Sequence, residues 1–133
     1  MVVLFVTALV RMPPSGTAMR VFAIMQDDMQ AVLAHGGTVV EQHNAAKPST
    51  VFMIRTLSMA GWSRQLAQSY GDTLRSRRWV PLDAANTRFC KAGMVAEIRG
   101  NAGMRGMESI NTVTMNYDLQ SVERCKRAGK GGT

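Results

Sequence analysis

The sequence predicts a single α+β domain, in which a four-stranded antiparallel sheet carries two helices on one face. Its 133 residues suit one domain. A composition of 46% hydrophobic and 19% charged residues is typical of a chain that builds a packed core. Stretches with a two-residue apolar period also alternate with stretches whose apolar residues recur at three- and four-residue steps. We expect the domain to span residues 1–116 and a basic C-terminal tail to span residues 117–133.

The first half of the chain predicts a strand, a helix and further strands. Val2–Val10 is rich in β-branched residues and apolar on both faces, as in a central strand, and it is too short for a membrane span of about twenty residues. Thr38–His43 predicts a second strand. After a break or bulge at Asn44–Ser49, Val51–Leu57 resumes extended character, as a continuation of the same long strand or as a hairpin. Between the first two strands, Thr17–His35 predicts a helix. The residues expected on its buried side are Val21, Phe22, Met25, Met29 and Leu33.

The second half predicts one more helix between two strands. Ala60–Leu74 fits either a loop or a short helix. Arg77–Asp83 predicts a strand at a sheet edge, because Pro81 cannot donate a hydrogen bond to a neighbouring strand. Met104–Met115 predicts the last strand, and the tail after it is expected to be extended or disordered without a partner. The second helix is expected from Asn86 or Thr87 to Gly100, burying Phe89, Cys90, Met94, Val95 and Ile98. The resulting β-α-β-β-α-β order is that of the ferredoxin-like fold.

The net charge predicts a polyanionic partner. Sixteen Lys and Arg against nine Asp and Glu give +7, with a pI near 10.3. Residues 1–46 hold two basic and three acidic groups (−1), whereas residues 47–133 hold fourteen and six (+8). The alternative is that the excess only keeps the surface solvated.

A group of arginines beside a tryptophan is the strongest candidate binding feature. Arg75, Arg77 and Arg78 precede Trp79, and guanidinium groups pair with phosphates while an aromatic ring offers a stacking platform. The alternative is that Trp79 lies in the core and the arginines flank a strand. With the other basic residues of this region, the predicted RNA-binding residues are Arg55, Arg64, Arg75, Arg77, Arg78, Arg105, Arg124, Lys126 and Arg127.

No catalytic, cofactor or metal motif stands out, so we expect a protein that is not an enzyme and holds no cofactor or metal. His35 and His43 are too few for a metal site. Asp27-Asp28 is expected on a solvated helix face. Gly100–Gly106 resembles a phosphate-binding loop, but it would lead from a helix into a strand and is expected to be a turn. The two cysteines, Cys90 and Cys125, form no recognisable pair and indicate free thiols in a reducing compartment.

The order and spacing of these segments over residues 2–115 resemble the sixth protein of the small ribosomal subunit, of bacterial and mitochondrial type. The similar parts are the first strand and helix with Gly36–Val40, then an Arg-x-Leu step, and later a strand, an Asp-containing turn and a helix. The segments that carry the resemblance are Val2–Val10, Thr17–His35, Arg55-Thr56-Leu57, residues 78–99 and Gly103-Met104-Arg105.

This resemblance implies a ferredoxin-like domain that binds small-subunit rRNA and has no catalytic activity. It also implies contacts with the eighteenth small-subunit protein and other ribosomal proteins, and no membrane partner. The implied location is a mitochondrial ribosome, with a bacterial-type ribosome in the cytoplasm as the alternative. Two other functions stay open on the same fold: a different RNA-binding module such as an RRM, whose aromatic signature is missing here, and a small-molecule-binding or enzymatic domain.

Overall fold

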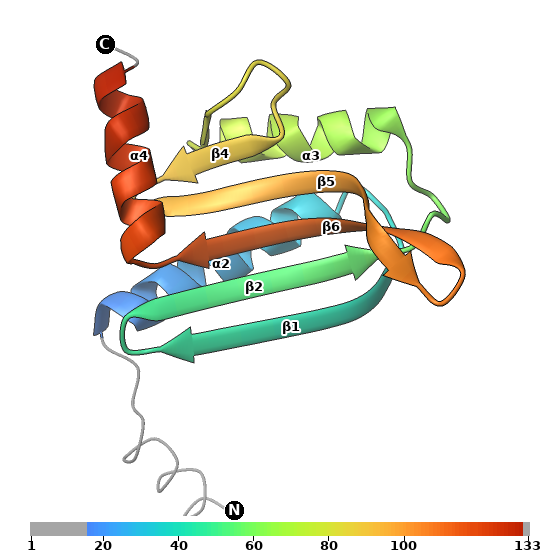
Figure 1. Ribbon diagram of the computed structural model, residues 1–133, viewed down its shortest axis with the longest axis horizontal. Coiled ribbons are helices and arrows are strands. Elements are labelled where there is room, and N and C mark those ends of the chain that lie inside the picture. The colour runs from blue at the N-terminus through green and yellow to red at the C-terminus, as the bar shows by residue number, and fades with distance from the viewer. Residues whose placement is uncertain (1–15, 132–133) are drawn as a thin grey trace, which may run out of the picture.

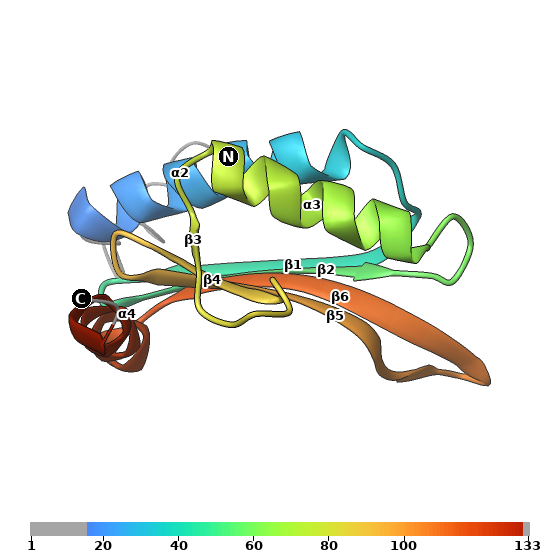
Figure 2. The same cartoon turned by 90° about the horizontal axis from the view of Figure 1, so that it is seen from above.

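A six-stranded antiparallel sheet forms the centre of the structure (Figure 1). The computed structural model describes residues 16–131. In Figure 2, α2 and α3 lie along one face of the sheet, and α4 lies at one end towards the other face. The predicted four-stranded ferredoxin-like fold is therefore wrong, although two helices do share one face. The elements are α2 (Gly16–Leu33), β1 (Val39–Lys47), β2 (Thr50–Leu57), α3 (Arg64–Ser76), β3 (Val80–Pro81), β4 (Arg88–Lys91), β5 (Met94–Arg105), β6 (Glu108–Tyr117) and α4 (Leu119–Gly131).

The predicted first helix is confirmed as α2, within two residues at each end. Its apolar residues recur at three- and four-residue steps, so they form one stripe that packs on the sheet. Val21, Met25 and Met29 are buried as expected, whereas Phe22 and Leu33 are partly buried and pack against the edge of the core. The predicted strand Val2–Val10 lies outside the described residues.

The hairpin of β1 and β2 turns at Pro48 and Ser49, because Lys47 pairs with Thr50. β1 therefore continues through much of the stretch expected to break the strand. It is the outer strand of the sheet and is largely exposed. β2 pairs on its other side with β6, and its residues Val51, Met53 and Leu57 are fully buried beneath the helices.

Residues 60–74, for which a loop and a short helix were both open, contain most of helix α3. Ser63 caps it, since its Oγ accepts a hydrogen bond from Leu66 N at 3.0 Å. Leu66, Tyr70 and Leu74 are buried at four-residue steps. The Tyr70 hydroxyl donates to the carbonyl of Gly36 at 2.5 Å, which ties α3 to the connection after α2.

The second predicted helix, residues 86–100, is wrong: this stretch forms the hairpin of β4 and β5. Lys91 pairs with Met94 across Ala92 and Gly93, whose φ angles of 48° and 86° suit a two-residue hairpin turn. Residues on both faces of the hairpin are apolar, because α3 covers one face and α4 covers the other. That double coverage hides the two-residue period of a strand. The predicted strand at residues 77–83 shrinks to the two residues of β3, which pair with β4.

The last strand begins later than expected and pairs with an unusually long β5. β5 and β6 turn at Gly106 and Met107, and their register shifts between Arg99 and Gly103. The segment Gly100–Gly106 thus belongs mostly to a strand. The order β1-β2-β6-β5-β4-β3 places the late strands β6 and β5 at the centre of the sheet.

The expected disordered tail is instead helix α4, which a disulfide joins to the sheet. Asp118 Oδ1 accepts from Ser121 N at 2.7 Å and Asp118 N donates to Ser121 Oγ at 2.8 Å, so the start of the helix is capped reciprocally. Ser121 Oγ also donates to Gly93 O at 2.7 Å. One turn later Cys125 is bonded to Cys90 of β4, so the expectation of free thiols is wrong as well. No helix within residues 16–131 is long and apolar enough to cross a membrane.

Replacing Met25 by Ala is expected to destabilise the fold by about 2–5 kcal/mol, because its side chain is fully buried and a cavity would remain. Denaturant unfolding measures the loss. Met19→Ala on the exposed side of α2 is the control, and it should change the unfolding free energy by less than about 0.5 kcal/mol. Equal losses for both variants would mean that the stripe is misplaced.

Reducing the disulfide is expected to cost about 3–4 kcal/mol, because the bond closes a loop with a sequence separation of 35. Denaturant unfolding with and without a thiol reductant measures this difference. The double variant Cys90→Ser/Cys125→Ser should have the unfolding free energy of the reduced protein, with or without reductant. A wild-type unfolding free energy that does not change on adding reductant would contradict the prediction.

Candidate nucleic-acid interface

The carboxylate of Asp28 is the centre of the most heavily bonded polar cluster. It is 2% exposed and lies on the sheet side of α2. It accepts hydrogen bonds from Arg77 Nε at 2.6 Å, Lys91 Nζ at 2.7 Å and Trp79 Nε1 at 2.8 Å. The neighbouring Asp27 is exposed and pairs with the other side of the Arg77 guanidinium. The expectation of a solvated acidic pair therefore fails for Asp28.

Opposing effects set the pKa of Asp28. Burial alone would raise it, but the hydrogen bonds from Lys91, Arg77 and Trp79, with the charge of Lys91, bring the pKa below its usual value. The carboxylate is thus charged at neutral pH. The hydrogen bond with Asp28 in turn raises the pKa of Arg77.

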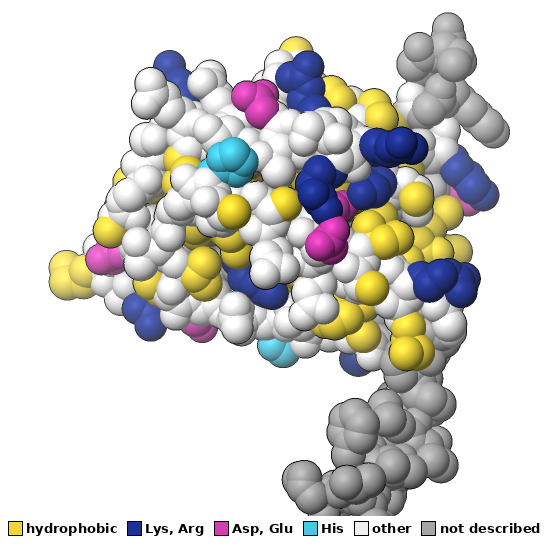
Figure 3. Space-filling view, turned by 180° about the vertical axis from the view of Figure 1, so that it is seen from behind, with side chains coloured by type: hydrophobic (Ala, Val, Ile, Leu, Met, Phe, Trp, Pro, Cys, Tyr) yellow, Lys and Arg dark blue, Asp and Glu magenta, His cyan; other side chains and the backbone are white. Residues whose placement is uncertain are grey.

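This cluster engages two members of the predicted arginine–tryptophan site in contacts within the protein. Trp79 is 1% exposed and anchors the core, so its ring offers no stacking platform. Arg77 is held by two carboxylates. Arg75 and Arg78 stay exposed, and on the helical face several Lys and Arg side chains gather near acidic ones (Figure 3).

Three other predicted residues lie apart from these. Arg64 is exposed at the first turn of α3, about 16 Å along the helix from Arg75 at 1.5 Å per residue. Arg55 is 8% exposed and donates to Asn44 Oδ1 at 2.8 Å, and burial lowers its pKa. Arg105 pairs with Glu41 at 3.6 Å. Arg55 and Arg105 are thus engaged within the protein.

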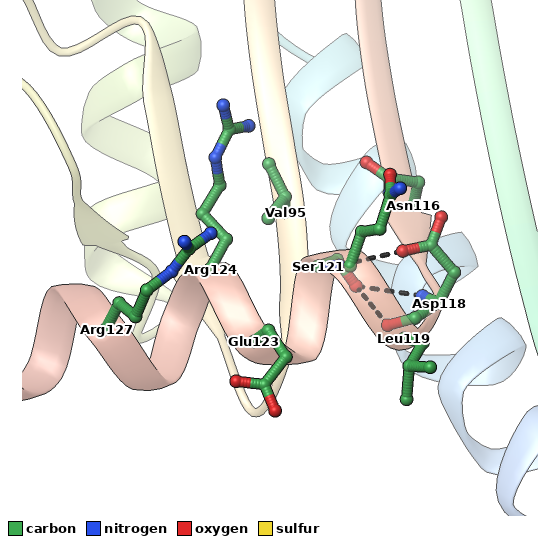
Figure 4. A pocket seen from close by; sticks show the side chains of 9 residues that line it. Val95, Asn116, Asp118, Leu119, Ser121, Glu123, Arg124 and Arg127 are labelled. Atoms are coloured by element: carbon green, nitrogen blue, oxygen red, sulfur yellow. Dashed lines mark hydrogen bonds between the residues drawn. The ribbon is translucent and has the colours of Figure 1, made fainter.

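Two predicted residues do come together, on α4. Arg124 and Arg127 line one depression of about 580 Å³ between α4 and the sheet, together with Asn116 and Val95 (Figure 4). Neither guanidinium makes an intramolecular hydrogen bond or ion pair, whereas Asp118, at the rim, is occupied in capping the helix. In Figure 4 the Glu123 side chain points away from the two arginines. Lys126 does not line this depression.

The depression opens onto the sheet face that α2 and α3 leave uncovered. Side chains alternate along β5 and β6, so Thr112, Thr114 and Asn116 lie opposite the buried Val113 and Met115 side. Arg99 pairs with Thr112 in register, is exposed, and has no intramolecular partner. It lies roughly 14 Å along β5 from Val95 at 3.4 Å per residue.

Arg99 and Asn116 were missed from the sequence. Their signal would be the alternation along β5 and β6, which is readable only after both strands and their register are known.

Free cations outnumber free carboxylates over the part of the chain whose side chains are described, residues 16–128. The acidic groups with no intramolecular partner are Asp72, Glu108 and Glu123. The basic groups with none are Lys47, Arg64, Arg75, Arg78, Arg99, Arg124, Lys126 and Arg127. The unpaired charge at the surface is therefore mainly positive. Arg124 and Arg127 on α4 are the two of these basic residues that line a depression together.

No protein-family model, no curated protein and no solved structure matches this chain. The contacts and charges described above are therefore the basis for the candidate interface.

Replacing Asp28 by Asn is expected to destabilise the protein by about 1–3 kcal/mol at pH 7, because it removes the charged acceptor of the half-buried Arg77 and Lys91 side chains. The lowered pKa also sets the pH response. The stabilisation is complete above the unfolded-state value of about 3.9 and is lost as the pH falls through the lower folded-state value.

Denaturant unfolding at a series of pH values tests this, and the acid-side loss should be smaller in the Asp28→Asn variant. Asp72→Asn removes an exposed carboxylate without a partner and is the matched control. Comparable losses from the two substitutions at pH 7 would contradict a buried ionic anchor.

Proposed function

We propose that this protein is an RNA-binding domain that contacts RNA phosphates through Arg124 and Arg127. The bound RNA strand then runs along the sheet face that α2 and α3 leave uncovered. The observation that carries the proposal is that both guanidiniums line one depression and neither is engaged by the protein. Guanidinium groups pair with phosphate oxygens in a bidentate geometry, and a free pair needs no internal bond broken first.

The neighbouring sheet face supplies what a nucleic acid strand needs beyond charge. The half-buried Thr114 and Asn116 offer a hydroxyl and an amide group to sugars and base edges. Arg99 adds a further cation along β5. This arrangement supports contacts to the backbone more than base-specific recognition.

The ribosomal function stays a prediction from the resemblance, which rested on an order of elements that differs from the observed one. Its partners would be small-subunit rRNA and the eighteenth small-subunit protein, and its location a mitochondrial ribosome. Co-sedimentation of the native protein with small subunits tests this, and its absence there with intact RNA binding would leave a different RNA as the partner.

The disulfide favours a second candidate, an anionic phospholipid surface in an oxidising compartment. Disulfides persist chiefly in such compartments. The same cations would then meet phosphate headgroups. Vesicles with and without anionic lipid, compared with RNA at equal salt, separate the two candidates.

The affinity for single-stranded RNA is expected to fall steeply with salt, because binding releases counterions from the phosphates. Each phosphate contact adds about 0.7 to the log–log slope for single strands, so Arg124→Gln/Arg127→Gln should lower its magnitude by about 1.4. Fluorescence anisotropy across a salt series measures the slope.

The matched control is Arg75→Gln/Arg78→Gln, which removes the same charge from two exposed arginines at the other face. Its slope should stay close to that of the wild type. A reduced slope in this variant alone would move the interface to α3, and no binding by the wild type would overturn the proposal.

A further inference from the structure

A second cavity, of about 510 Å³, lies between α3 and residues 82–87, the loop that joins β3 to β4. Ile98 of β5 and Ala67 of α3 contribute its apolar lining. Its size falls in the range of about 300–1,000 Å³ that is common for small-molecule sites. It is separate from the depression beside α4, with which it shares no residue.

Five residues with polar side chains line this cavity without side-chain hydrogen bonds or ion pairs within the protein, and all but Trp62 are exposed. Trp62 is half-buried, and its ring makes an edge contact with Tyr70, while its indole N–H has no acceptor in the protein. No buried side-chain nitrogen or oxygen of the described residues lacks a partner, so the Trp62 N–H is open to the solvent that fills the cavity. The other four side chains supply a cation, two amides and a carboxylate: Arg64, Gln68, Asn86 and Asp72.

The loop that forms one wall is held in place by its own hydrogen bonds. Asp83 accepts from Thr87 N at 3.0 Å and from Thr87 Oγ1 at 2.6 Å, and these bonds lower its pKa despite some burial. Thr87 O accepts from Ile98 N at 2.9 Å, which ties the loop to β5. The wall that presents Asn86 is therefore formed before any ligand arrives, which reduces the entropic cost of binding.

Two glycines keep the space open. A Cβ at Gly71 of α3 would lie 3.4 Å from Cζ of the core residue Phe89 and 3.6 Å from the carbonyl oxygen of Asn86, which lines the cavity. A Cβ at Gly100 would lie 3.5 Å from Trp62 Nε1. Neither glycine has a positive φ, so each position accepts a larger residue by backbone conformation. The lack of a side chain at these two positions therefore leaves the cavity its volume.

We propose that this cavity binds one nucleotide, with its base against Trp62 and its phosphate at Arg64. An indole ring offers a stacking surface, and amides such as those of Gln68 and Asn86 provide both a donor and an acceptor for the edge of a base. The Asp72 carboxylate accepts from sugar hydroxyls. An aromatic ring, two amides, a carboxylate and a guanidinium together match the base, sugar and phosphate of a nucleotide.

A free mononucleotide and an unstacked nucleotide of an RNA strand present this same chemistry. We take the RNA unit as the ligand, and in that form the inference rests on the proposed function. Single-stranded RNA suits such a cavity, because its bases can be splayed out and stacked on aromatic side chains.

Isothermal titration of the folded protein with AMP, GMP, CMP and UMP tests the site, with ribose 5-phosphate as the probe that lacks a base. The nucleotides should bind about tenfold or more tightly than ribose 5-phosphate, because stacking on an aromatic side chain accounts for that much. Trp62→Leu should weaken nucleotide binding by a similar factor. Arg64→Gln should weaken binding of nucleotides more than that of nucleosides.

Gly71→Ala is the decisive variant, because it narrows the cavity while alanine is the better helix former. It should keep or raise the thermal midpoint and weaken nucleotide binding several-fold. Arg75→Gln, an exposed change on the same helix outside the cavity, is the matched control and should leave the affinity unchanged. Absence of nucleotide binding, or equal affinities of wild type, Trp62→Leu and Gly71→Ala, would overturn the inference.

A short RNA oligonucleotide separates this inference from the proposed function. Gly71→Ala should weaken the binding of the oligonucleotide by the same factor as the binding of mononucleotides. If the variant weakens only mononucleotide binding, the site takes free nucleotides and the RNA form of the inference is overturned. If mononucleotides bind but no RNA does, the proposed function fails and the nucleotide site stands. If RNA binding depends on Arg124 and Arg127 while no mononucleotide binds, the nucleotide site fails alone.

Discussion

The buried carboxylate of Asp28 is the interaction on which the arrangement of the layers depends. It joins α2 to the end of α3 through Arg77, to β3 through the neighbouring Trp79, and to the β4–β5 hairpin through Lys91. Moving a charge out of water costs several kcal/mol, and three donors are what make the buried position tolerable. Those donors come from segments far apart in the chain from Asp28. All three hydrogen bonds therefore form only when α2 and α3 take one relative position over the sheet. That position also fixes where α3 faces residues 82–87, and therefore where the second cavity lies.

The same carboxylate explains why the number of basic residues is a poor guide to the binding surface. Arg77 and Lys91 are two of the sixteen Lys and Arg residues, yet both are paired with carboxylates of α2. Arg88 and Arg105 are likewise paired with glutamates. What acts on a distant polyanion is the remainder, located at the two ends of α3, on the uncovered sheet face and on α4. A polyanion near the molecule therefore meets several separate positive areas, of which the one on α4 is shaped as a depression.

The spacing of apolar residues was enough to predict α2, β2 and the buried side of each. Both segments bury a single face, so their apolar residues recur with the period of a helix or a strand. The β4–β5 hairpin was misread as a helix for a tertiary reason. Cys90 and Val95 are buried beneath α4, so apolar residues occupy both faces of the hairpin and imitate helical spacing. α4 in turn was misread as a tail, because its own apolar side is small and its attachment depends on a disulfide that the spacing of two cysteines does not reveal. Arg124 and Arg127 could be named as candidates from charge, whereas Arg99 and Asn116 required the strand register.

The two proposed sites differ in what holds them in place, and this makes them separable in chemistry as well as in space. α4 lies across one end of the strands, and α3 begins near the opposite end (Figure 1). The arginine pair on α4 depends on the Cys90–Cys125 bond and on the capping contacts of Ser121 with Asp118 and Gly93. Reduction leaves only the capping contacts and the packing of a short helix, so the proposed phosphate site would be less well ordered under reducing conditions. The cavity beside α3 contains no cysteine, and its walls are held by Asp28 and Asp83. A reductant should therefore weaken the proposed phosphate contacts on α4 far more than the proposed nucleotide binding beside α3.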